Sequence, residues 1–151
     1  MNVPLILTQF LDRAVSLYGD KQAIICEDRV FTYHELGERV NRLSHGLKKL
    51  GVQKGERIAY LAPNSVEMLE GFYGIFQLGG VMVPLNIRLK PEDYLFILNH
   101  SEAKILFVDQ DLYHLISPIK DKLETIEEII VHYKDSETAE VGYDAWLEHQ
   151  S

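Results

Sequence analysis

The chain of 151 residues is 46% hydrophobic, 10% aromatic and 25% charged, and its 23 acidic and 15 basic residues give a formal charge of −8. This composition is typical of a globular domain that buries a core without disulfides, and it excludes disordered and fibrous proteins. The negative charge argues against a nucleic-acid-binding protein, which needs a concentrated basic face.

A single cysteine, Cys26, excludes an internal disulfide framework and predicts a cytoplasmic protein. The first residues lack the basic flank of a signal peptide. The most apolar stretch, residues 68–85, contains Glu70, Gln77 and four glycines, and these argue against a membrane span.

In chain order, apolar residues at helical spacing over residues 4–18 predict an amphipathic helix. Residues 23–26 and 30–31, on either side of a polar turn, predict the two strands of a hairpin. Thr32 and Glu35 have the spacing of a capping box, and the long apolar stripe behind them predicts a second helix.

The remainder of the chain alternates between strands and helices. The expected strands are residues 58–62, 81–83, 104–108 and 129–131, and the expected helices are residues 65–78, capped by Asn64 and Glu67, residues 91–98, and a stretch within 112–123. This alternation predicts a three-layer α/β fold with a mainly parallel sheet and helices on both faces.

Charged residues cluster in two places. Bases between Arg39 and Arg57 alternate with leucines, which predicts the solvated face of a helix. The acidic tail from residue 121 onward predicts a lid or edge segment that is anchored by Tyr143 and Trp146.

Phosphate-binding turns in α/β proteins are usually rich in glycine and precede a helix. The first candidate turn, residues 62–65, has no glycine and predicts a plain helix start. Gly79 and Gly80 follow a helix and predict a chain reversal. Six histidines are scattered without the spacing of a metal motif, and we expect most of them at the surface.

Asp109 and Asp111 follow an expected strand and leave two interpretations open. Paired carboxylates at a strand's carboxyl end could hold magnesium, as in receiver domains, which would make this a non-catalytic binding or interaction module. Alternatively, Asp109 simply caps the following turn.

Several segments, in a fixed order, carry a more specific signal. They are residues 31–36 (FTYHEL), 51–59 (GVQKGERIA), 64–67 (NSVE), 79–81 (GGV), 84–89 (PLNIRL) and 101–108 (SEAKILFV). Together they resemble the N-terminal part of the AMP-forming adenylating enzymes, which include acyl-CoA synthetases, peptide-synthetase adenylation domains and luciferases. Bacterial fatty acyl-CoA synthetases look most similar.

The resemblance implies an ATP-dependent acid–thiol ligase that activates a carboxylic acid, here expected to be a fatty acid, as an acyl-adenylate and transfers it to coenzyme A. ATP, Mg²⁺ and coenzyme A would serve the full enzyme. Residues 1–151 would form its N-terminal subdomain, ending before the phosphate-binding loop, so the chain alone is expected to be inactive. Its partners would be the rest of the synthetase and, through exposed apolar surface, a second copy in a homodimer.

Arg88 is the one residue to which the resemblance assigns a ligand. In some coenzyme A ligases of this family, an arginine in the matching segment contacts a phosphate of the coenzyme's nucleotide. The alternative is a solvent-facing arginine before a helix that begins near Pro91.

Overall fold

The main sheet is parallel and has the strand order β4-β3-β5-β6. The computed structural model describes residues 6–132 and 143–150. The strands are β3 (Arg57–Leu61), β4 (Val81–Pro84), β5 (Ala103–Asp109) and β6 (Glu128–His132). The predicted parallel sheet is thus confirmed, and β3 and β5 at its centre are almost entirely buried, as expected for strands covered on both faces.

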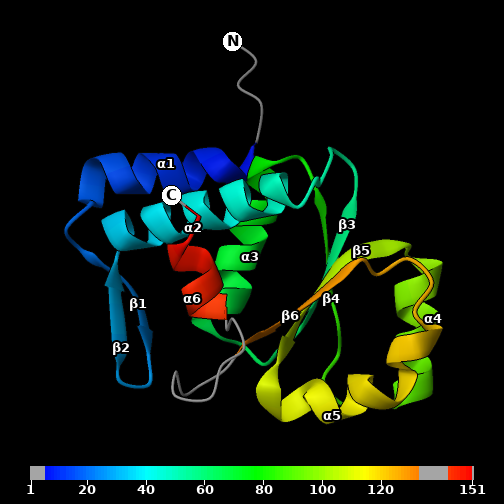
Figure 1. Ribbon diagram of the computed structural model, residues 1–151. Coiled ribbons are helices and arrows are strands. Elements are labelled where there is room, and N and C mark those ends of the chain that lie inside the picture. The colour runs from blue at the N-terminus through cyan, green and yellow to red at the C-terminus, as the bar shows by residue number, and fades with distance from the viewer. Residues whose placement is uncertain (1–5, 133–142, 151) are drawn as a thin grey trace.

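Helices cover both faces of this sheet, as predicted (Figure 1). Helix α3 (Val66–Gln77) connects β3 to β4 on one face, and α4 (Pro91–His100) connects β4 to β5 on the other. The chain moves outward from β3 to β4 and then returns past β3 to β5. Because strand–helix–strand connections in parallel sheets are almost always right-handed, this reversal of direction puts α3 and α4 on opposite faces of the sheet.

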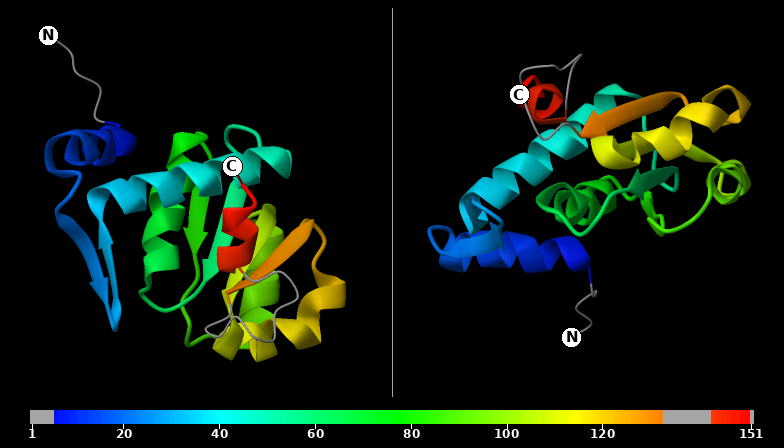
Figure 2. Two further views of the ribbon diagram at one scale, coloured as in Figure 1. Left: turned by 60° about the vertical axis from the view of Figure 1, so that its left-hand side comes forward. Right: turned by 90° about the horizontal axis from the view of Figure 1, so that it is seen from below.

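Two further helices and a hairpin precede the sheet in the chain. They are α1 (Leu7–Tyr18), β1 (Gln22–Cys26), β2 (Arg29–Thr32) and α2 (Tyr33–Lys49). The antiparallel β1–β2 hairpin stands apart from the main sheet, as both views in Figure 2 show. The predicted capping box starts α2: Thr32 Oγ1 accepts from the Glu35 N–H at 3.2 Å, and Glu35 Oε2 accepts from the Thr32 N–H at 2.7 Å.

The two faces of the sheet bury separate apolar clusters. Leu43, Tyr60, Ile75 and Phe107 belong to the cluster beneath α2 and α3. The second cluster lies beneath α4 and contains Leu61, Tyr94, Leu98 and Leu106. Alternate residues of the central strands therefore point to opposite faces, and each strand contributes to both clusters.

The predicted helix within residues 112–123 is broken into short pieces. The chain forms η1 (Gln110–Leu112), α5 (Tyr113–Ile116) and η2 (Ser117–Lys122). Pro118 explains the break, because it lacks an N–H and cannot sit inside a continuous α-helix.

Two smaller expectations were wrong. The N-cap of α3 is Ser65 and not the expected Asn64: the Ser65 hydroxyl accepts from the Met68 N–H at 3.2 Å. Glu67, the other expected cap, turns toward Arg29. Arg39 does not lie on a solvated face, because its side chain is only 18% exposed and pairs with acids from α3 and α6.

Helix α6 (Tyr143–Glu148) packs against the same face as α2 and α3 (Figure 1). Tyr143 is 2% exposed, which confirms its predicted role as an anchor, and Trp146 packs against the same cluster. Residues 121–132 of the predicted lid or edge segment include β6, which is the edge strand of the main sheet. Residues 133–142 of that segment lie outside the described residues. None of the helices within residues 6–132 and 143–150 has the length and apolar character needed to cross a bilayer.

Candidate functional site

The carboxyl ends of parallel strands form the edge at which α/β proteins usually bind ligands. Strand β3 leads to β4 on one side and β5 leads to β6 on the other, so the switch point lies between the carboxyl ends of β3 and β5. Two hollows open at this edge. Pro63 and Asn64, in the loop after β3, line both of them.

The hollow at the switch point is acidic and has a volume of about 390 Å³. Its carboxylates come from the hairpin turn, α3, β5 and α6, and they are Glu27, Asp28, Glu67, Asp109 and Asp144. Arg29 is the only lysine or arginine among its lining residues. This surplus of negative charge disfavours a phosphate or carboxylate ligand.

Arg29 neutralises one of these carboxylates. Its Nη1 donates to Glu67 Oε1 at 2.7 Å. Burial alone would raise the pKa of Glu67, but the hydrogen bond from Arg29 and the positive charge of this arginine outweigh burial and lower the pKa to about 2. Glu67 is thus held as a carboxylate in a fixed ion pair.

His132, at the end of β6, also lines the acidic hollow. It is 7% exposed, and its ring centroid lies 4.3 Å from that of Tyr143. Its Nε2 has no hydrogen-bond partner among the described residues. Burial lowers the pKa of His132 to about 4, so the ring is neutral at neutral pH and acts as a packed part of the core.

The second hollow is mostly apolar, with a volume of about 510 Å³. Met68 and Phe72 of α3 line it together with Pro84, Leu85 and Ile87 from the end of β4 and the segment after it. Phe72 and Ile87 remain 37% and 38% exposed. The hollow therefore offers apolar surface immediately beside the segment that contains Arg88.

Arg88 lies in a short segment between β4 and α4. The Leu85 N–H donates to the Tyr60 carbonyl oxygen at 2.8 Å, and beyond this bond the chain leaves the sheet. Asn86 Oδ1 accepts from the Arg88 N–H at 3.0 Å, the bond of an Asx turn. The Arg88 side chain is exposed, and the ion pairs of the described residues do not include it.

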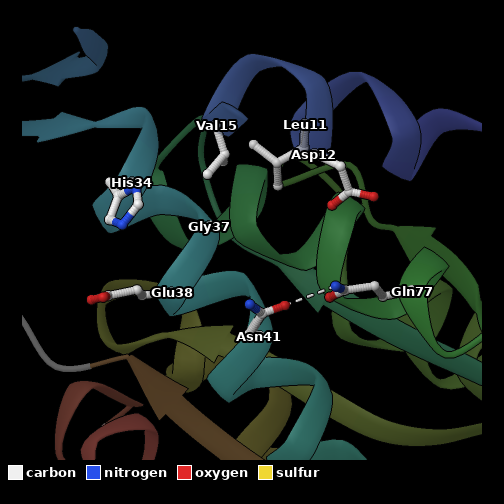
Figure 3. Close-up of a pocket in the computed structure, with 8 residues that line it drawn as sticks. All are labelled: Leu11, Asp12, Val15, His34, Gly37, Glu38, Asn41 and Gln77. Atoms are coloured by element: carbon white, nitrogen blue, oxygen red, sulfur yellow. Dashed lines mark hydrogen bonds between the residues drawn. The ribbon is translucent and has the colours of Figure 1, made fainter. Parts of the chain in front are cut away.

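A third hollow, of about 280 Å³, lies between α1 and α2 (Figure 3). Leu11, Asp12 and Val15 line it from α1, and Gln77 Nε2 donates to Asn41 Oδ1 at 2.8 Å across its other side. It lies near the end of α3, away from the carboxyl edge of the sheet, and no lysine or arginine lines it.

The two interpretations of Asp109 and Asp111 can now be compared. Asp109 Oδ1 accepts from the Asp111 N–H at 2.9 Å, so Asp109 caps η1, as the simpler interpretation predicts. Within residues 6–132 and 143–150, no group of three or more His, Cys, Asp and Glu side chains could hold a metal ion. The receiver-like magnesium site gains no support from these residues.

The histidine prediction holds for all but one position. His34, His45, His100, His114 and His149 are exposed, but His132 is buried. The signal that could have found it is the two-residue period of β6, which puts His132 on the same face as the buried Ile130.

Sequence reasoning also missed a buried polar network that connects three helices. Glu70 of α3 is 0% exposed. Its carboxylate accepts from Arg39 of α2, through Nε and through Nη2 at 3.3 Å, and from the Tyr143 hydroxyl of α6 at 2.7 Å. Arg39 Nη2 also donates to Asp144 at 2.8 Å. This network connects α6, whose Asp144 lines the acidic hollow, to α2 and α3.

Comparison with known proteins connects these features to a family. Residues 11–150 match the family model described as AMP-binding enzyme. The chain is 36% identical over 152 aligned positions to a long-chain-fatty-acid–CoA ligase of Thermus thermophilus, covering 98% of this chain and 28% of that protein. It is 34% identical over 113 residues to a 3-hydroxybenzoate–CoA/4-hydroxybenzoate–CoA ligase of Thauera aromatica, covering 75% of this chain and 22% of that protein.

The fold comparison agrees. The crystal structure of an anthranilate CoA ligase in complex with anthranoyl-AMP superposes with a TM-score of 0.90 at 31% identity, covering 98% of this chain and 29% of that one. The chain thus spans less than a third of the length of these three relatives. The match over nearly all of its length shows that the chain belongs to the AMP-binding, or adenylate-forming, enzyme family.

Proposed function

We propose that this chain is the N-terminal subdomain of an ATP-dependent ligase that activates a carboxylic acid as its acyl-adenylate and transfers the acyl group to coenzyme A. The observation that carries the proposal is the family match over residues 11–150, together with the three relatives described above, each of which is named as a CoA ligase. We place the ligase in the cytoplasm, which agrees with the free Cys26.

The identity of the carboxylic acid substrate is less well defined than the type of reaction. Relatives at similar identity are named for a long-chain fatty acid, for hydroxybenzoates and for anthranilate. A fatty acid remains our first candidate, supported by the alignment over 98% of the chain with the long-chain-fatty-acid ligase.

The exposed apolar face of α1 supports the proposal that this chain is part of a larger protein. Leu7, Phe10 and Leu17 are 56%, 55% and 57% exposed, while Leu11 of the same helix is buried against α2 and its neighbours. A row of exposed apolar side chains on one helix is typical of a surface that another segment covers. We propose that the remainder of the ligase covers it.

Within this subdomain, Arg88 is the residue that we propose to contact coenzyme A. Its guanidinium is exposed and lacks an ion pair among the described residues, which suits contact with a phosphate. ATP and magnesium are different, because the described residues offer no group of metal ligands and the switch-point hollow is acidic. We therefore assign no step with ATP or magnesium to this chain.

ATP–pyrophosphate exchange tests the proposal. The chain alone is expected to give no exchange with fatty acids, hydroxybenzoates or anthranilate, whereas a ligase that contains it should exchange with at least one acid. Exchange by the chain alone would disprove its role as an inactive subdomain. A ligase that fails with every acid would leave adenylation without support.

A further inference from the structure

The segment that carries Arg88 is held at both of its ends. At its start, the backbone bond from Leu85 to Tyr60 fixes the exit from the sheet. At its end, the Lys90 N–H donates to Asp93 Oδ2 at 3.0 Å, and Pro91 is the first residue of α4. Between these two points lie only residues 86–89, most of whose side chains are exposed.

Tyr94 holds the first residue of this segment from inside the protein. It belongs to the second turn of α4 and is 0% exposed, in the cluster beneath that helix. Its hydroxyl donates to the Asn86 carbonyl oxygen at 2.8 Å. One buried phenol therefore fixes the backbone at the start of the four-residue segment.

This contact continues to Arg88 through Asn86. The Asn86 carbonyl is bound by Tyr94, and the Asn86 side chain accepts from the Arg88 N–H. A fixed backbone limits where the guanidinium can lie, and a ligand that binds an ordered segment loses less free energy in ordering it.

On this basis, which assumes the coenzyme A contact proposed above, we infer that Tyr94 is a positioning residue: its hydroxyl orders residues 86–89 so that Arg88 is held ready for a phosphate of coenzyme A. Tyr94 itself lies beneath the segment and does not touch the ligand. Replacing Tyr94 by Phe should weaken coenzyme A binding about fivefold, the factor that corresponds to one ordinary hydrogen bond.

The test is an NMR titration of the ¹⁵N-labelled chain with coenzyme A, following the amides of residues 86–89. Five proteins are compared: the unchanged chain, Arg88→Ala, Arg88→Lys, Tyr94→Phe and Tyr113→Phe. Tyr113 packs against the same cluster, so its Phe variant is the matched control for removing a tyrosine hydroxyl. Hydrogen exchange at the Arg88 amide provides a readout that does not depend on the ligand.

The inference expects coenzyme A to shift the amides of residues 86–89, and Arg88→Ala to abolish that shift. Arg88→Lys should retain part of the binding, since it keeps the charge. Tyr94→Phe should bind about fivefold more weakly, exchange its Arg88 amide faster and keep its melting temperature within a few degrees, with Tyr113→Phe unchanged.

The opposite outcomes can be told apart. If Tyr94→Phe binds like the unchanged chain, the positioning role is wrong and the coenzyme A contact stands. If Arg88→Ala binds normally, or the unchanged chain shows no shift at residues 86–89, the proposed contact itself is wrong and the positioning role falls with it.

Discussion

Replacing Arg39 by Met should destabilise the chain strongly, because it leaves the Glu70 carboxylate buried without a cation. In the native protein, two N–H groups of Arg39 and the Tyr143 hydroxyl satisfy this carboxylate. Burial raises the pKa of Glu70 even with Arg39 present, since the arginine opposes the effect of burial only in part. After the substitution, only the Tyr143 hydroxyl of these donors remains.

The expected loss can be estimated in two ways. Breaking a buried ion pair by removing one partner typically costs about 3–5 kcal/mol. Independently, Glu70 can escape by taking up a proton, and for a carboxyl with an ordinary pKa of 4.5 this costs about 3.4 kcal/mol at pH 7. The cost of protonating Glu70 is an upper limit on the electrostatic part of the loss, because protonation removes the buried charge. We therefore expect the free energy of unfolding to fall by about 3 kcal/mol and the melting temperature to fall by about 10 °C.

The sign of the pH dependence follows from the same argument. In Arg39→Met, the folded state holds a proton on Glu70 that the unfolded state releases above its ordinary pKa. Stability relative to the unchanged chain is therefore lost as pH rises and regained as pH falls. At pH 5, the protonation cost drops to about 0.7 kcal/mol, so most of the loss should disappear.

Urea unfolding at pH 7 and pH 5, followed by circular dichroism, measures both effects. Glu102→Gln is the matched control, because Glu102 pairs with Arg57 while 70% exposed and should change stability by less than about 1 kcal/mol. The double variant Arg39→Met/Glu70→Met should recover much of the loss. An Arg39→Met loss that is equal at the two pH values would refute the reasoning.

Three other changes probe the fold. His132 binds its proton more weakly in the folded state, where its pKa is lowered to about 4, so the unchanged chain should lose about 2 kcal/mol of unfolding free energy between pH 6.5 and pH 4.5 through this residue. His132→Phe should remove this part of the pH dependence, and identical urea profiles for the two proteins would contradict the reasoning. Thr32→Ala should cost about 1 kcal/mol through the lost cap, and Thr32→Ser should restore it in the same assay. Gly74→Ala should cost about 1–3 kcal/mol, because its Cβ would lie 2.8 Å from Leu43; an increase in melting temperature would show that the helices can separate.

The sequence predicted elements well wherever local chemistry determines them. The capping box at Thr32, the reversal at Gly79 with its φ of +71° and the alternation of strands with helices all rest on residues within a few positions of one another. The strand order was not predictable in this way. Alternation indicates parallel pairing, but the return from β4 past β3 to β5 depends on which faces the helices can cover.

The candidate site was less predictable for a related reason. Glu67 and Glu70 are charged residues in a helix with few charges, and they pair with Arg29 and Arg39, which lie 38 and 31 positions earlier. No local pattern identifies such partners. Tyr94 was likewise visible only as an apolar position of α4, because its contact with Asn86 depends on how the helix packs beneath the segment after β4.

The distribution of charge along the carboxyl edge indicates how the edge could serve a ligase. Carboxylic acids, ATP and coenzyme A are all anions, yet the hollow at the switch point carries five carboxylates and only one arginine, already paired with Glu67. The apolar hollow beside Arg88 has no charged lining residue. An anion should therefore meet less repulsion at the β4 side of the edge than at the switch point. For the ligase proposed above, we accordingly expect the groups that neutralise ATP to come from other parts of the protein, and the proposed coenzyme A contact of this chain to lie at the β4 side of the edge.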